Sequence, residues 1–156
     1  MITIREAKFS DIEGILPIWK QMMELHDPMD EKYYRRVPHG PTLMKKFLRF
    51  HIRKADSEVI VAASPNQIVG YALAYVQANP PVFTRRRYGY LSDLAIREGF
   101  LGRGIGKRLV HEIKTWMLSK NLHYVELKVH SKNSGAIASY KKMGFQEGHK
   151  LMRQLL

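Results

Sequence analysis

A glycine-rich segment between an apolar run and an amphipathic helix is the feature that most constrains this chain. Residues 94–110 have the pattern of a strand end, a short loop and a helix. The loop and the first helical turn carry alternating glycines and several cations: Gly102, Arg103, Gly104, Gly106, Lys107 and Arg108. Such glycines let the backbone turn tightly, and the helix N-terminus adds unpaired N–H donors and a positive dipole end. Together these groups predict a cradle for a phosphate or pyrophosphate.

The spacing of these residues excludes two common phosphate-binding loops. A Walker A loop would need a glycine at the position of Leu101 and a hydroxyl at the position of Arg108. The dinucleotide-binding pattern G-x-G-x-x-G fails because its third glycine falls on Lys107 or Leu109. The alternative interpretation is a glycine-rich helix start that binds no ligand.

The length of the chain, 156 residues, predicts one domain spanning residues 1–156, with enough buried surface for a proper core. The absence of cysteine excludes disulfides and thiolate chemistry. No signal-like N-terminal run occurs, and no apolar stretch approaches the roughly 20 residues that span a bilayer. We therefore expect a cytoplasmic protein with no membrane partner.

The positive charge is the unusual bulk property. The formal net charge is +12, which favours attraction to nucleic acid, an anionic cofactor or an acidic protein. Most of the cations are dispersed and are expected on solvated helix faces. The run at residues 85–87 is expected in a loop available to a partner.

Hydrophobic periodicity gives the order β-α-α-β-β-β-α-β-α-β(-β) and hence an α/β fold with helices on the faces of a mixed sheet. Strands are predicted at residues 2–7, 59–63, 68–77, 88–96 and 124–129, with one or two more in 145–155. Helices are predicted at residues 11–26, 42–54, 104–119 and 134–143. Ser10 is expected to cap the first helix together with Glu13, Pro17 to kink or break it, and Gly144 to end the last one.

Two motifs in this order resemble the GNAT superfamily of acyl-CoA-dependent N-acetyltransferases. The loop that ends at Gly106 resembles the family pattern Gln/Arg-x-x-Gly-x-Gly/Ala, with Leu101 where the family usually has Gln or Arg. Residues 133–145 match Asn-x-x-Ala-Ile-x-x-Tyr-x-x-x-Gly-Phe. The resemblance covers the whole chain and implies a mostly antiparallel, twisted mixed sheet of six to seven strands flanked by four helices.

The resemblance also implies that acetyl-CoA is the co-substrate, with its pyrophosphate on the loop and its pantetheine beside the preceding strand. Asn133 would hydrogen-bond the pantetheine arm, with a plain helix cap as the alternative. Tyr140 matches the general acid that protonates the departing thiolate, with a buried structural tyrosine as the alternative. The residues implied to bind the cofactor are Leu94, Ala95, Ile96, Leu101, Gly102, Arg103, Gly104, Ile105, Gly106, Lys107, Asn133 and Tyr140.

The sequence offers three candidates for the general base. Ser92 occupies the position where a similar strand of diamine acetyltransferases has its catalytic glutamate, which argues against a polyamine acceptor. Asp93 remains as a candidate, although strand alternation points it away from Ser92 and favours a structural role. His130 is a second candidate base, since imidazole is a common general base, and Glu126, on the same strand face, is a third. No metal-binding pattern occurs.

The sequence thus predicts direct transfer of an acetyl group from acetyl-CoA to a primary amine. Residues 127–133 resemble a segment of protein N-terminal acetyltransferases, so a protein or peptide amine is the first candidate acceptor and a small-molecule amine the second. A basic surface would suit an acidic acceptor or an acidic protein partner. A homodimer follows from family analogy alone. The rival hypothesis is a non-catalytic basic module that binds nucleic acid or an acidic protein and holds CoA as a ligand.

Overall fold

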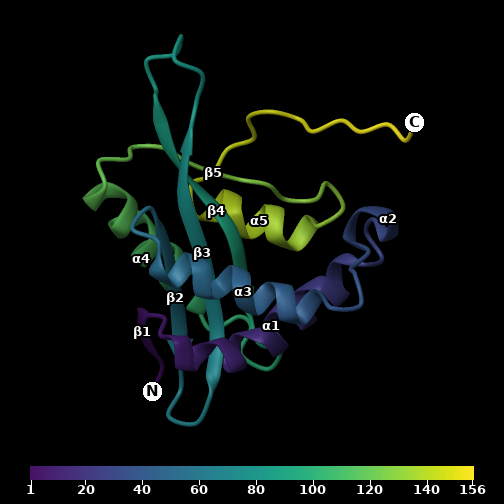
Figure 1. The fold of residues 1–156 in the computed structure, drawn as a ribbon, viewed down its shortest axis with the longest axis vertical. Helices are drawn as coiled ribbons and strands as arrows, with labels where there is room; N and C mark the ends of the chain where they lie inside the picture. Colours follow the sequence, from purple (N-terminus) through teal and green to yellow (C-terminus); the bar gives the residue numbers. More distant parts are fainter.

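A five-stranded sheet forms the centre of the protein in the computed structural model, which describes residues 1–156 (Figure 1). The strands follow one another across the sheet in chain order: β1 (Thr3–Glu6), β2 (Ser57–Ala63), β3 (Ile68–Ala78), β4 (Arg87–Ile96) and β5 (Val125–Leu127). The first four strands pair antiparallel, whereas β5 runs parallel to β4. This arrangement confirms a mixed, mostly antiparallel sheet.

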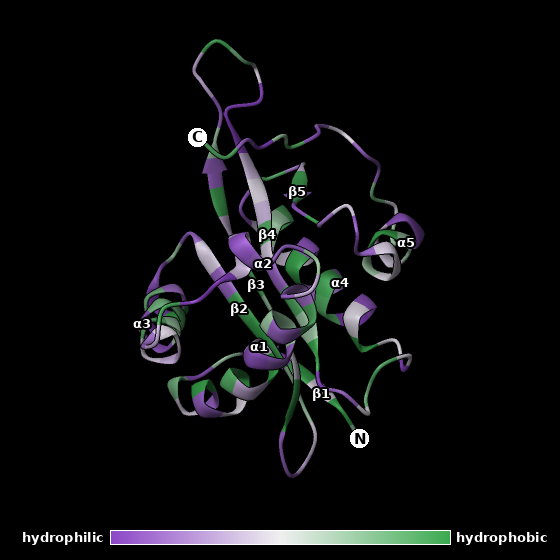
Figure 2. Ribbon diagram, turned by 90° about the vertical axis from the view of Figure 1, so that its right-hand side faces the viewer, coloured by the Kyte–Doolittle hydropathy of each residue, from purple (hydrophilic) through white to green (hydrophobic).

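Helices cover both faces of the sheet (Figure 2). On one face lie α1 (Ile12–His26) and α3 (Gly40–Arg53), and on the other lie α4 (Ile105–Ser119) and α5 (Ser134–Lys142). A 3-10 turn, η1 (Phe9–Asp11), precedes α1, and the short α2 (Glu31–Tyr34) interrupts the connection between α1 and α3. No helix is both long enough and apolar enough to span a bilayer.

Each face of the sheet has its own apolar core. Ile15, Leu48 and Tyr71 are fully buried between the sheet and the α1/α3 layer. Leu109 and Ile113 are fully buried against the opposite face. Because β2 and β3 are covered on both sides, their sequences are almost continuously apolar rather than alternating.

A bulge in β4 changes which side chains face α1 and α3. Leu73 of β3 pairs with Asp93, but the next residue pairs with Leu91, which leaves Ser92 without a partner. The extra residue shifts the alternation by one position. The Tyr90 ring lies 5.5 Å from the Tyr75 ring of the α1/α3 core, and Asp93 faces this same side. The expectation that Asp93 points away from Ser92 was therefore wrong, because it assumed an unbroken strand.

The structure corrects three other expectations. The sheet has five strands rather than six or seven, because residues 145–155 form no strand and β5 is only three residues long. Five α-helices occur rather than four, since α2 forms within residues predicted as loop. Ser10 does not cap α1, because the N-cap position of α1 is Asp11. The Asp11 side chain makes no hydrogen bond to the N–H groups of the helix and instead accepts the Lys8 N–H at 2.7 Å. Helix α1 also continues through Pro17.

Candidate active site

The loop between β4 and α4 has the conformation that its glycines predict. Gly102 and Gly104 have φ angles of 75° and 73°, a region that side chains with a Cβ rarely adopt. Gly99, which the sequence analysis did not single out, also lies there, with a φ of 86°. Gly104 is the N-cap of α4, and Gly106 lies in the first helical turn. The loop is thus built from left-handed turns that lead into a helix N-terminus.

The N–H groups of this loop are unpaired. The Phe100 N–H donates to the Arg97 carbonyl, and the Arg108 N–H donates to the Gly104 carbonyl at 3.2 Å. None of the seven N–H groups between them donates to a backbone oxygen. A Cβ built on Gly102, Gly104 or Gly106 would meet no atom within 4 Å, so the glycine positions are open to solvent. Exposed N–H donors at a helix N-terminus fit the pyrophosphate of a CoA thioester.

The three cations near the loop differ in their roles. Arg103 stacks its guanidinium over the Phe100 ring at 4.9 Å and remains exposed. Arg108 donates to the Ile2 carbonyl at 2.9 Å and so ties α4 to the segment before β1. Lys107 lines a groove between β1 and α4. Arg103 and Lys107 are therefore the cations available to an anion at the loop.

Strands β4 and β5 separate just before the loop. Their pairing runs from Gly89↔Val125 to Leu91↔Leu127, where β5 ends, whereas β4 continues to Ile96. Residues 94–96 pair with β3 on one side and have no strand partner on the other. Leu94, Ala95 and Ile96 thus have no strand on the side that leads toward the glycine loop, where a pantetheine arm would lie, although the Ile96 carbonyl accepts the Gln21 amide at 2.9 Å.

Tyr140 of α5 packs partly buried against the core on the α4 side, with its ring 5.6 Å from that of Phe145. Burial raises the pKa of Tyr140 to about 12, and the negative charge of Asp93 adds to the rise. The hydroxyl therefore stays protonated at neutral pH, as a general acid must.

Asp93 is held by two hydroxyl groups. Its carboxylate accepts a hydrogen bond from the Tyr71 hydroxyl at 2.7 Å and another from the Ser92 hydroxyl at 2.7 Å. Burial raises the pKa of Asp93, while the two hydrogen bonds oppose the rise. Sequence reasoning missed Tyr71, because its contact with Asp93 depends on the pairing of β3 with β4.

His130 lies outside this pair. Its Nδ1 accepts the Lys132 N–H at 3.1 Å, and its Nε2 lies 3.8 Å from Asp30. The Tyr34 ring is 6.1 Å away. Both ring nitrogens thus face other residues of the protein. His130 contacts the loop after α1 and makes no contact with Tyr140 or Asp93.

Asn133 is the N-cap of α5, and its side-chain oxygen accepts the Ala136 N–H at 3.2 Å. The predicted cap is confirmed, while contact with a pantetheine arm stays a prediction. Gly144, with a φ of 94°, follows the C-cap of this helix as expected. Glu126 is exposed on β5, and its charge contributes to a raised pKa of Tyr88, whose main cause is burial. No group of three or more potential metal ligands occurs.

Comparison with known proteins agrees with this geometry. The family model described as Acetyltransferase (GNAT) family matches residues 19–145, which include the loop, both separating strands and Tyr140. The chain belongs to the GNAT family. It is an acyl-CoA-dependent N-acetyltransferase.

This GNAT protein is similar to enzymes with different acceptors. It is 27% identical over 151 residues to a thialysine N-epsilon-acetyltransferase from Bos taurus, which covers 94% of this chain and 85% of the relative. It is 26% identical over 151 residues to an N-alpha-acetyltransferase from Sulfurisphaera tokodaii, covering 92% and 80%. A crystal structure of a mutant BH1408 protein from Bacillus halodurans superposes with a TM-score of 0.89, at 26% identity and 99% coverage of both chains.

Proposed function

We propose that residues 1–156 form a single catalytic domain that transfers an acetyl group from acetyl-CoA directly to a primary amine. One observation carries this proposal: the unpaired N–H groups of the glycine loop continue into the end of β4 that no strand covers, next to Asp93. The loop is expected to bind the pyrophosphate, and the β4 edge the pantetheine arm. This path brings the thioester to β4 beside Asp93, whose charge adds to the raised pKa of the Tyr140 hydroxyl.

The chemistry requires two proton transfers. The amine nitrogen attacks the thioester carbonyl carbon, the carbon–sulfur bond breaks, and the sulfur leaves as a thiolate. In this proposal Tyr140 donates its hydroxyl proton to that sulfur. The attacking nitrogen gives up a proton to Asp93, directly or through a water. The raised pKa of Asp93 brings its basicity nearer to neutral pH, and Tyr71 and Ser92 hold its orientation.

The acceptor is expected to belong to one of two classes of amine. A protein or peptide amine is our first candidate, in line with the relative named as an N-alpha-acetyltransferase. A small-molecule amine is the second, in line with the relative named for thialysine. An acidic protein partner, a homodimer and a cytoplasmic location stay predictions.

The experiment that tests this function is a thiol-release assay with acetyl-CoA and a panel of amines and peptides. The chain has no cysteine, so every thiol detected comes from CoA. Tyr140→Phe is expected to lower kcat by roughly a hundredfold or more without weakening acetyl-CoA binding, because only the proton donor is lost. Tyr124→Phe is the matched control, since Tyr124 is exposed on the approach to β5 and its contact with Arg85 uses only the ring.

Two outcomes would contradict the proposal. A Tyr140→Phe variant with the wild-type rate would remove the general-acid role. A protein that binds no acetyl-CoA in calorimetry, but binds nucleic acid with an affinity that falls steeply with salt, would support the non-catalytic module instead.

A further inference from the structure

A carboxylate and an aromatic ring in the segment between α1 and α3 hold a guanidinium group. The Arg153 Nη1 forms an ion pair with Asp30 Oδ2 at 3.0 Å. The Arg153 guanidinium carbon also lies 4.0 Å from the centroid of the Tyr33 ring. An ion pair and a cation–π contact on the same group form a binding site for an organic cation. The occupant in this structure is the chain's own C-terminal segment.

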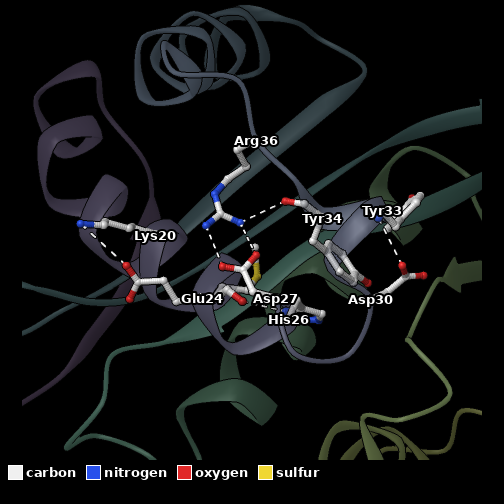
Figure 3. A network of polar contacts seen from close by, with 9 residues as sticks. Lys20, Glu24, His26, Asp27, Asp30, Tyr33, Tyr34 and Arg36 are labelled. Carbon is white, nitrogen blue, oxygen red and sulfur yellow. Dashed lines mark hydrogen bonds and ion pairs between the residues drawn. The ribbon is translucent and has the colours of Figure 1, made fainter.

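The segment that carries Asp30 is held in place by its own contacts (Figure 3). Arg36 donates two hydrogen bonds to Asp27, at 2.7 and 3.0 Å, and a third to the Tyr34 carbonyl at 3.1 Å. Asp30 accepts the Tyr33 N–H at 3.2 Å. Asp27 is thereby neutralised within the segment, whereas Asp30 directs its charge outward to a cation from elsewhere.

This cation site lies beside the segment between β5 and α5. Asp30 lies 3.8 Å from His130, just ahead of α5, the helix that carries Tyr140. The Tyr34 ring, 4.9 Å from the Tyr33 ring, also lies 6.1 Å from the His130 ring. The cation site therefore lies beside the segment that leads from β5 into α5.

The occupying segment is not part of the folded sheet. Residues 145–156 form no helix or strand and run across the molecule toward α2 (Figure 1). Leu151, Met152 and Leu155 are 62%, 90% and 80% exposed, so apolar packing does not hold this end of the chain. Arg153 attaches the last residues of the segment to the body through Asp30 and Tyr33, and such exposed contacts are weak enough to exchange with a ligand.

We propose that Asp30 and Tyr33 bind a second, cationic group of the acceptor, and that Arg153 occupies their site until the acceptor displaces it. The proposal rests on the proposed acetyl transfer and narrows its acceptor to an amine that also carries a guanidinium or ammonium group. The net charge of +12 disfavours cations at the surface as a whole. The carboxylate of Asp30 and the ring of Tyr33 attract a single cationic group strongly enough to offset this general repulsion.

Agmatine and butylamine are the probes for this proposal. Agmatine has a primary amine at one end and a guanidinium like that of Arg153 at the other, whereas butylamine has the same chain and no second charge. Removing the competing side chain in Arg153→Gln is expected to tighten agmatine binding and lower its KM by roughly three- to tenfold, with kcat unchanged. Asp30→Asn is expected to abolish the preference for agmatine over butylamine, and it keeps a side-chain oxygen for the Tyr33 N–H. Lys150→Gln is the matched control, because it removes a cation from the same segment.

Two measurements separate this proposal from the proposed function. Calorimetric titration of agmatine onto the full chain, with and without CoA, reports the cation site even if no acetyl group is transferred. Absence of agmatine binding to Arg153→Gln, or equal changes for agmatine and butylamine, would overturn the cation site. Failure of acetyl-CoA to bind or of thiol release to occur, with agmatine binding still dependent on Asp30, would overturn acetyl transfer and leave the cation site standing.

Discussion

Replacing Gly104 or Gly106 with alanine adds the same methyl group two residues apart, and we expect opposite effects on stability. Gly104 has a φ of 73° and a ψ of 6°, whereas Gly106 lies inside the first turn of α4 without a positive φ. A Cβ at either position meets nothing within 4 Å. Steric clash is thus absent from both variants, and the difference comes from the backbone conformation alone.

The magnitudes follow from that conformation. A residue with a Cβ costs about 1–2 kcal/mol in the left-handed region, partly offset by the lower entropy of its unfolded state. Gly104→Ala should therefore lower the free energy of unfolding by about 1 kcal/mol. In a helix, alanine is favoured over glycine by about 0.5–1 kcal/mol, so Gly106→Ala should raise that free energy. For a chain of 156 residues, 1 kcal/mol corresponds to a shift in Tm of about 2–4 °C.

Thermal unfolding followed by circular dichroism measures both shifts, and calorimetry with acetyl-CoA measures the effect on the loop. Gly104→Ala is expected to weaken acetyl-CoA binding several-fold, because relief of the strain turns the loop N–H groups away from the ligand. Gly106→Ala is expected to bind acetyl-CoA like the wild type, as an alanine fits the family pattern there. Shifts in Tm of the same sign, or unchanged acetyl-CoA affinity in Gly104→Ala, would refute this account of the loop.

Two further predictions concern the pH dependence of stability. Burial raises the pKa of Glu58 to about 7, so the folded protein resists its ionisation and loses stability as pH rises from the ordinary glutamate value through 7. Because Glu58 is partly solvated, we expect Glu58→Gln to raise Tm by only about 2–4 °C at pH 8 and to leave Tm unchanged at pH 4. Thermal melts at both pH values measure this difference, and an equal effect on Tm at both would contradict the ionisation argument. The bidentate hydrogen bond from Arg5 holds the pKa of Asp11 below its ordinary value, so this contact stabilises at neutral pH and is lost as pH falls through the lowered pKa. Asp11→Asn should therefore lower the free energy of unfolding by about 1–3 kcal/mol at pH 7 and by less at pH 3, measured by urea titration, and no loss at pH 7 would refute it.

The glycine loop and the main helices could be predicted from the sequence because their determinants are local. Gly102 and Gly104 have the positive φ angles that their spacing implies, and the apolar stripe of α4 faces the core. Asn133 caps its own helix through a contact only three residues away. Such features depend on residues that are close along the chain, so a single sequence contains all that decides them.

The arrangement around Asp93 depended on strand pairing. Alternation alone predicts that Asp93 points away from Ser92, but the register of β3 against β4 leaves Ser92 unpaired and reverses the alternation beyond it. Tyr71 reaches Asp93 only because those two strands are neighbours. No local pattern in either strand contains this information, since a bulge is defined by the partner strand.

The C-terminal residues also depend on contacts between distant segments rather than on local pattern. Their hydrophobic pattern predicted a strand at 145–155, but residues 145–156 pair with no strand of the sheet. The contact between Arg153 and Asp30 joins two ends of the chain that no periodicity connects. The sequence by itself determined the phosphate-binding loop, the helices and the family, because these follow from short-range spacing and backbone preference. Only the tertiary structure decided the partners of Asp93 and the cation held at Asp30, because both arise where distant segments meet.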